Sequence, residues 1–133
     1  MTVFLDASAL ISLIAGEVDA RDLSDRLEAE DSRLCSALST WETLAGLRRS
    51  HGLSLESARK RIRTLLDTCE ITFVNIGEQE FEVAADAYEK FGKGRHPASL
   101  NFGDCFAYAC AKTNGARLMF KGDDFSKTDI AVC

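Results

Sequence analysis

The chain has 133 residues, of which 46% are hydrophobic, and this is enough for a core that needs neither disulfides nor a structural metal. The net charge of -5 argues against a protein that holds nucleic acid by its overall charge alone. The five cysteines are odd in number and scattered without metal-ligand spacing, so we expect reduced thiols and a cytoplasmic protein. We expect a single domain over residues 1–133, without a signal peptide or a membrane span.

Short apolar runs alternate along the chain with stretches of helical character. Leu10, Leu13 and Ile14 recur at helical spacing after the first run. Between residues 39 and 66 we expect two helices broken near Gly52, and further helices over residues 78–91 and 105–112. Strands that alternate with helices predict an α/β fold with a parallel sheet. The apolar runs, each predicted to form a strand, are residues 3–5, 34–38, 71–76, 117–120 and 130–132.

Acidic side chains stand where these strands end or where the helices begin. Asp6 follows the first run, Glu42 and Asp104 stand near expected helix starts, and the pair Asp123 and Asp124 follows the fourth run. In a parallel sheet, strand carboxyl ends and the N-termini of the following helices lie along one edge, so these acids are expected to converge. Each like-charged pair at about 4 Å repels by roughly 4 kcal/mol at an effective dielectric near 20. Convergence therefore predicts a bound cation, and oxygen ligands favour Mg²⁺ or Mn²⁺.

Each acid, taken alone, also has an ordinary structural explanation. Asp6 suits the N-cap of the helix that follows it. Glu42 stands three residues after Ser39, which is the spacing of a capping box. Asp104 at a helix start interacts favourably with the helix dipole, and the later aspartates suit a turn. Only their shared edge favours a site over a set of caps.

Aromatic residues are expected mainly in the core. Phe102, Phe106 and Cys110 recur at helical spacing, which predicts core packing rather than stacking on a base. Trp41, beside Glu42, is expected in the core as well, with a protein interface as the alternative.

Four segments carry a resemblance to a known family: FLDASAL, STWETLAGL, LNFGDCFAYACAK and LMFKGDDFSKTDI, in this order along the chain. The chain resembles the PIN-domain ribonucleases, and among them the VapC-type toxins of toxin-antitoxin pairs. The resemblance implies a three-layer fold with a central parallel sheet flanked by helices. It also implies a Mg²⁺-dependent endoribonuclease, with Mn²⁺ as a plausible substitute, that hydrolyses RNA phosphodiesters by metal-activated water. The implied toxin of a type II pair is a homodimer, is held by a cognate antitoxin, and meets DNA only through that antitoxin.

The same resemblance assigns roles to the acids. Asp6 and Asp104 are implied as direct metal ligands, and Glu42 matches the second acid of the family. Either Asp123 or Asp124 fills the place of the fourth acid, with Asp123 slightly favoured by its distance from the strand end.

Other polar residues lie near the same expected edge. Ser8 and Asn101 are candidates to support a metal ligand or the scissile phosphate, and helix capping explains both equally well. Basic residues there either contact the RNA backbone or are solvated loop charges. They are Lys93, Arg95, His96 and Lys121.

Two alternatives stay open. A phosphoaspartate phosphotransferase or a receiver domain also places acids at strand ends and uses a lysine such as Lys121, although Ser8 stands where a haloacid-dehalogenase-like phosphatase carries an acid. A catalytically silent PIN-like module would use the acidic crevice only to bind a basic partner segment. Mg²⁺-dependent cleavage by the isolated chain separates this module from the nuclease.

Overall fold

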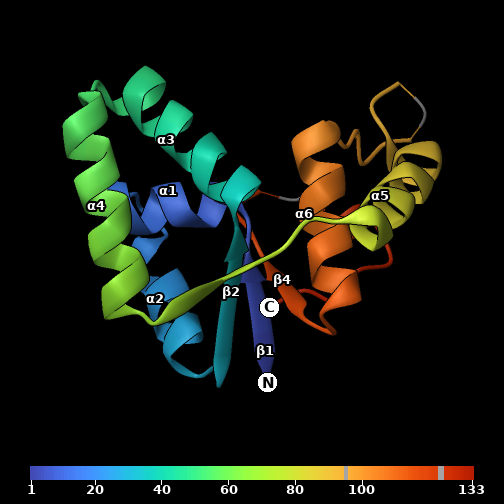
Figure 1. The fold of residues 1–133 in the computed structure, drawn as a ribbon, viewed down its shortest axis with the longest axis horizontal. Coiled ribbons are helices and arrows are strands. Elements are labelled where there is room, and N and C mark those ends of the chain that lie inside the picture. The colour runs from blue at the N-terminus through green and yellow to red at the C-terminus, as the bar shows by residue number, and fades with distance from the viewer. Residues whose placement is uncertain (95, 123–124) are drawn as a thin grey trace.

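Four parallel strands form the central layer of the protein, and helices cover both faces of the sheet (Figure 1). The computed structural model describes residues 1–94, 96–122 and 125–133. Helices α1 to α4 lie on one side of the sheet, and α5 and α6 lie on the other. The predicted three-layer α/β fold is therefore confirmed. In chain order the elements are β1 (Thr2–Leu5), α1 (Ala7–Ala15), α2 (Ala20–Glu28), β2 (Ser32–Ser36), α3 (Ala37–His51), α4 (Leu55–Thr68), β3 (Ile71–Val74), α5 (Glu78–Phe91), α6 (Phe102–Thr113), β4 (Arg117–Met119) and the 3-10 helix η1 (Phe125–Lys127).

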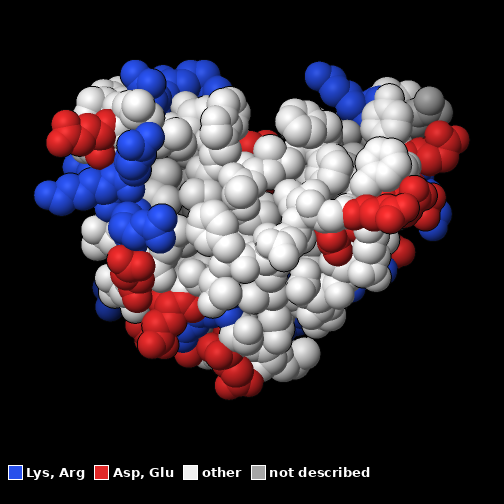
Figure 2. Space-filling model, in the orientation of Figure 1, with Lys and Arg blue, Asp and Glu red and all other residues white. Residues whose placement is uncertain are grey.

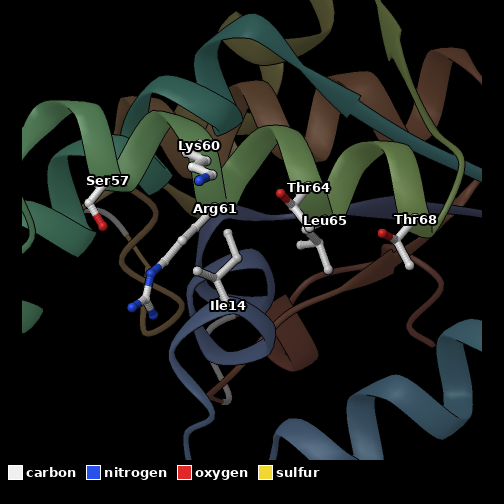
Figure 3. Close-up of a pocket in the computed structure, with 7 residues that line it drawn as sticks. All are labelled: Ile14, Ser57, Lys60, Arg61, Thr64, Leu65 and Thr68. Atoms are coloured by element: carbon white, nitrogen blue, oxygen red, sulfur yellow. The ribbon is translucent and has the colours of Figure 1, made fainter.

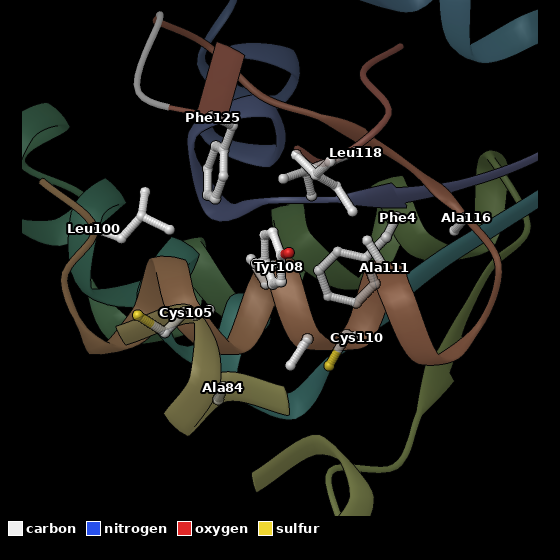
Figure 4. Close-up of a cluster of buried hydrophobic side chains, with 14 of the residues drawn as sticks. Phe4, Ala84, Leu100, Cys105, Tyr108, Cys110, Ala111, Ala116, Leu118 and Phe125 are labelled. Carbon is white, nitrogen blue, oxygen red and sulfur yellow. The ribbon is translucent and has the colours of Figure 1, made fainter. Parts of the chain in front are cut away.

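The strand order β3-β2-β1-β4 places β1 inside the sheet, between β2 and β4. Because both faces of β1 are covered, its side chains alternate between two cores. Val3 and Leu5 pack in the core against α1 to α4. Phe4 packs in the other core, with Tyr108 and Leu118 among its members (Figure 4). A slip of one residue would exchange these faces, so the two cores fix the register of β1.

The strands all run in the same direction, so their carboxyl ends lie along one edge of the sheet. Only Asp6 separates the end of β1 from the start of α1, and β2 passes directly into α3. Helix α6 precedes β4 and runs opposite to it, which brings the N-terminus of α6 to the same edge (Figure 1). Residues from β1, α3 and α6 can therefore meet there although they are far apart in the chain.

The predicted break between two helices near Gly52 is confirmed. Helix α3 ends at His51, Gly52 adopts the left-handed conformation with a φ of 65°, and Ser54 caps α4 by accepting a hydrogen bond from the backbone of Ser57. Glycine adopts a positive φ without a steric cost, so it suits this helix end. Within the described ranges, every helix is too short or too polar to cross a lipid bilayer.

The predicted fifth strand is wrong. Within residues 130–132 only Val132 pairs with β4, through an isolated bridge to Leu118. Leu118 donates its N–H to Ala131 O at 2.9 Å and accepts from Cys133 N at 3.0 Å. A strand requires consecutive pairs, whereas this segment meets the short β4 at one position only. The second predicted strand is also shifted, because β2 ends at Ser36, which caps α3.

Candidate active site

Asp6 lies at the end of β1 and caps α1. Its backbone N–H donates to Met119 O at 3.0 Å, which ties the end of β1 to β4. Its Oδ2 accepts hydrogen bonds from the backbone N–H of Ser8 at 3.1 Å and from the Ser8 hydroxyl at 2.7 Å. The capping explanation is therefore confirmed, and it holds a buried carboxylate, only 7% exposed, at the sheet edge.

Asp104 lies in the first turn of α6. Its backbone N–H donates to Asn101 Oδ1 at 2.8 Å, and its Oδ2 accepts from the backbone N–H of Asn101 at 3.0 Å. This reciprocal capping box fixes the carboxylate where the helix dipole favours a negative charge. Asn101 therefore caps the helix and supports Asp104 at the same time.

Glu42 does not cap α3, so the capping-box explanation of its position is wrong. Because β2 ends early, α3 begins at Ala37, and Ser36 forms the capping box with Ser39 instead. Glu42 lies more than a turn into the helix, and its carboxylate rests against Gly103 of α6. A methyl group added at Gly103 would lie 2.1 Å from Glu42 Oε2. The packing of α3 against α6 thus brings Glu42 beside the helix turn that carries Asp104.

The carboxylates of Asp6, Glu42 and Asp104 lie within electrostatic reach of one another. Burial, together with the negative charges of Asp6 and Asp104, raises the pKa of Glu42 to about 7. Glu42 is therefore close to half protonated at neutral pH. The structure brings the three acids together, although Asp6 and Asp104 are 98 positions apart in the chain.

The surface is hollowed at the edge of the sheet where the strands end. Figure 2 shows this hollow as a notch between the lobe of α1 to α4 and the lobe of α5 and α6, with acidic atoms at its floor. Lysine and arginine side chains lie at the top of both lobes, and acidic side chains lie lower on them. A polyanion can thus be held by the basic flanks while one phosphate approaches the acids, provided that a cation offsets their charge.

Asp123 and Asp124, the candidates for the fourth acid, lie outside the described residues, as does Arg95. Within the described part of the chain, no group of three or more His, Cys, Asp or Glu side chains could hold a metal ion as it stands. The donor chemistry of Asp6, Glu42 and Asp104 nevertheless fits Mg²⁺ or Mn²⁺, because these side chains offer only carboxylate oxygens. Burial and the neighbouring carboxylates raise the pKa of Glu42, and a divalent cation beside these acids would lower it.

The described basic residues near this edge have local partners in several cases. Lys121 Nζ binds Glu17 Oε1 at 2.8 Å and lies 4.0 Å from Asp19 Oδ1. His96 Nδ1 accepts from the backbone N–H of Ala98 at 3.0 Å. For Lys121 the structure thus favours a structural ion pair over a free phosphate contact.

Two aromatic residues expected in the core are exposed. Trp41 is 63% exposed and Phe102 is 67% exposed, so both predictions are wrong. Phe102 opens the first turn of α6, and the core begins one turn later, where Phe106 and Cys110 pack as predicted. The interface alternative for Trp41 remains.

Gly103 is a site residue that the sequence did not single out. Glycine is unfavourable inside a helix, yet it stands in the first turn of α6 directly before Asp104. This cost could have singled out Gly103, because a glycine at an unfavourable position indicates a close approach by another group. In the structure the approaching group is the Glu42 carboxylate.

The raised pKa of Glu42 predicts a pH-dependent stability in the absence of divalent cations. Its folded pKa of about 7 lies above the ordinary 4.5, so the stability that protonated Glu42 contributes is complete below pH 4.5 and is lost as the pH rises through 7. Between pH 5 and pH 8 we expect a loss of roughly 2 kcal/mol, which Glu42→Gln should largely remove. Urea unfolding in EDTA at pH 5 and at pH 8 measures this loss of stability. The exposed Glu82→Gln is the control, and an equal loss in both variants would contradict the assignment.

The comparisons with known proteins decide the family. The model of the PIN domain family matches residues 3–131. The chain belongs to the PIN-domain family. This PIN-domain protein is 38% identical to Ribonuclease VapC30 of Mycobacterium tuberculosis, over 96% of the chain and 95% of that relative. It is 35% identical to Ribonuclease VapC of Mycolicibacterium smegmatis, over 96% of the chain and 97% of the relative. The predicted likeness to VapC-type PIN proteins is therefore confirmed.

Solved structures show the same PIN fold. VapC20 of Mycobacterium tuberculosis, described as a Sarcin-Ricin loop cleaving toxin, superposes with a TM-score of 0.77 at 18% identity and covers 98% of both chains. VapBC-1 from nontypeable Haemophilus influenzae gives a TM-score of 0.76 at 18% identity, covering 100% of this chain and 97% of that chain. At such identities the likeness concerns the fold.

Proposed function

We propose that this PIN-domain protein is a Mg²⁺-dependent endoribonuclease and the toxin of a type II toxin-antitoxin pair. The observation that carries the proposal is the convergence of Asp6, Glu42 and Asp104 at one sheet edge, where burial and the charges of the other two acids raise the pKa of Glu42 to about 7. The names of similar proteins, which are VapC ribonucleases, also support the proposal. The basic flanks of the notch add an electrostatic reason for an RNA substrate (Figure 2).

Each acid of the proposed site has a distinct task. Asp6 and Asp104 are the proposed ligands, with Ser8 orienting the first and Asn101 the second. Glu42 is the proposed second-ion or water-holding acid, because its carboxylate lies beside Gly103 and interacts with the charges of the other two acids. When bound, Mg²⁺ would offset charge on the scissile phosphate and acidify an attacking water. Asp123 and Asp124 stay the candidates for the fourth acid.

Removal of the metal tests the proposal. We expect the purified chain to cleave RNA at discrete positions in Mg²⁺, to stop in excess EDTA, and to recover on addition of Mg²⁺ or Mn²⁺. The measurement is the sequencing of new RNA 5′ ends over time. Unchanged cleavage in EDTA would refute metal dependence. Absence of cleavage with every RNA, alongside tight binding of a partner protein, would favour the silent module.

The phosphoaspartate alternative receives no support from the structure. Family membership is with the PIN domain, and the Asp6 Oδ2 that would take part in phosphoryl transfer accepts two hydrogen bonds from Ser8. Incubation with acetyl phosphate and Mg²⁺ should leave the mass of the chain unchanged.

An antitoxin is the proposed protein partner. A groove of about 580 Å³ lies between α1 and α4, where Ile14 faces Arg61 and Leu65 (Figure 3). Lys60 adds a second positive charge to this lining, so the groove suits an acidic, amphipathic segment. A solved VapBC2 complex from Rickettsia felis is bound to a fragment of promoter DNA. We propose that this chain likewise meets DNA only through its antitoxin.

We also propose a homodimer, through the uncharged face that Figure 2 shows between the charged flanks. Exposed aromatic residues are common on the chain: Trp41, Phe73, Phe81, Tyr88 and Phe102. Three of them line an apolar groove of about 260 Å³ between α5 and α6. At roughly 200 Å² per aromatic side chain and about half exposure, these three offer ~300 Å² per copy. That is more than a third of the ~800 Å² per partner that a specific interface needs.

Loss of these aromatic anchors should weaken the dimer. We expect Trp41→Ala and Phe102→Ser to raise the dimer dissociation constant by at least ~10-fold each, because buried aromatic anchors dominate interfaces. Sedimentation over a range of concentrations measures it, with exposed Val18→Ser as the control. A monomeric parent at high micromolar concentration would rule the dimer out.

We propose that the protein is cytoplasmic. The five cysteines are all free in the structure, and burial raises the pKa of the Cys105 and Cys110 thiols to about 11 and about 12. Such thiols are poorly nucleophilic, which suits residues kept reduced in the cytoplasm.

A further inference from the structure

Glu17 lies in the turn after α1, and its carboxylate joins parts of the chain that are far apart in sequence. Oε1 accepts a hydrogen bond from Lys121 Nζ at 2.8 Å, just beyond the end of β4. Oε2 lies 3.0 Å from His51 Nε2, at the end of α3. The hydrogen bond from Lys121 lowers the pKa of Glu17, and the same contact raises the pKa of Lys121. Both groups therefore stay charged around neutral pH.

Lys121 is held a second time, through its backbone. Its N–H donates to Ser8 Oγ at 2.9 Å, and that hydroxyl donates to Asp6 Oδ2 at 2.7 Å. Hydrogen bonds thus connect the Glu17 carboxylate to the Asp6 carboxylate by way of Lys121 and Ser8. The Lys121 N–H donates to a lone pair of the Ser8 oxygen, so the hydroxyl hydrogen is directed towards Asp6.

We propose that Glu17 is a positioning residue for the cation site: by holding Lys121, it keeps the Ser8 hydroxyl on Asp6 and so fixes the plane of the Asp6 carboxylate. A carboxylate turns readily about its last torsion, so a ligand that is oriented in advance binds a cation better. This inference rests on the proposed function, because it presumes that Asp6 is a ligand. Glu17 would act on Asp6 through Lys121 and Ser8 and not by direct contact.

Nearby charges determine how the inference must be tested. Asp19 also faces Lys121, at 4.0 Å, and accepts from Ser12 Oγ at 2.5 Å. It gives Lys121 a weaker second partner, so the loss of Glu17 should loosen Lys121 rather than free it. His51 binds the other oxygen of Glu17 and does not take part in the connection to Asp6. His51→Ala is therefore a matched control for the loss of a Glu17 contact.

The test measures Mn²⁺ binding to the full chain by calorimetry, without RNA. We expect Glu17→Ala to weaken Mn²⁺ binding by about 10-fold, Glu17→Gln to restore most of it, and His51→Ala to leave it unchanged. In cleavage assays, Glu17→Ala should raise the Mg²⁺ concentration for half-maximal rate, while the rate at saturating Mg²⁺ recovers.

A second variant and a double-mutant cycle distinguish a positioning role of Glu17 from a general effect on the stability of the fold. Lys121→Met should weaken Mn²⁺ binding as much as Glu17→Ala does, and the double variant should lose no more, because both act through one connection. If Glu17→Ala lowers the melting temperature but leaves Mn²⁺ affinity at the parental value, while Asp6→Asn abolishes binding, the positioning role is wrong and the proposed function stands. If the parent binds no Mn²⁺, both fail.

Discussion

Asp6→Asn and Asp104→Asn are each expected to reduce RNA cleavage by more than ~100-fold while the chain keeps its fold. The loss should exceed the ~10–100-fold typical of residues that only support a ligand, because a neutral amide binds a hard cation far less well than a carboxylate does. Folding should survive. Asparagine caps a helix as well as aspartate does, and its carbonyl oxygen can accept the hydrogen bonds from Ser8 or from the Asn101 amide.

Both variants have a second expected effect that does not depend on RNA. Burial and the charges of Asp6 and Asp104 raise the pKa of Glu42 to about 7, and each variant removes one of these charges, so the pKa should fall but stay above its ordinary value of 4.5. Titration by NMR measures the pKa, and circular dichroism checks the fold. The exposed Asp67→Asn, at the end of α4, is the matched control. Cleavage at the parental rate by either variant would remove that residue from the proposed ligands.

Gly103→Ala is expected to reduce cleavage by about 100-fold without destabilising the protein. The new methyl group would lie 2.1 Å from Glu42 Oε2 and 2.7 Å from its Cδ, so the carboxylate must move away. A displacement of about 1 Å at a catalytic centre can cost roughly 100-fold in rate. The group that moves is the end of a flexible side chain, and alanine gains up to about 1 kcal/mol over glycine in a helix. Stability should therefore stay equal or rise.

Gly46→Ala is a matched control on the helix that carries Glu42. Its methyl group would lie 2.5 Å from Ile11 Cδ1, which is again the end of a flexible side chain, but one that packs in the core instead of the site. We expect Gly46→Ala to change the free energy of unfolding, as measured in urea, and to leave cleavage near the parental rate. If Gly103→Ala cleaves like the parent, Glu42 has no role in the reaction.

Local patterns in the sequence were sufficient for much of the fold. The alternation of apolar runs and helical stretches predicts the α/β class, and the glycine at position 52 marks the break between α3 and α4. Two wrong predictions, a strand at residues 130–132 and a buried Phe102, share a cause, because both depend on how distant parts of the chain pack. Residues 130–132 are as apolar as a strand, but pairing depends on a neighbour that offers more than one position. Phe102 has the spacing of a core residue, but its exposure depends on where the helix projects beyond the sheet.

The sequence by itself determined that Asp6 and Asp104 stand at a strand end and in a helix start, because capping is a local interaction between neighbours in the chain. The sequence also predicted that the acids converge, but only the tertiary structure decided how Glu42 meets the other two. The pKa of Glu42 and its contact with Gly103 arise from the packing of α3 against α6, and the pair of Glu17 and Lys121 joins residues 104 positions apart. Such contacts leave no local pattern, since the distance between the groups depends on how the helices and strands pack and not on their separation along the chain.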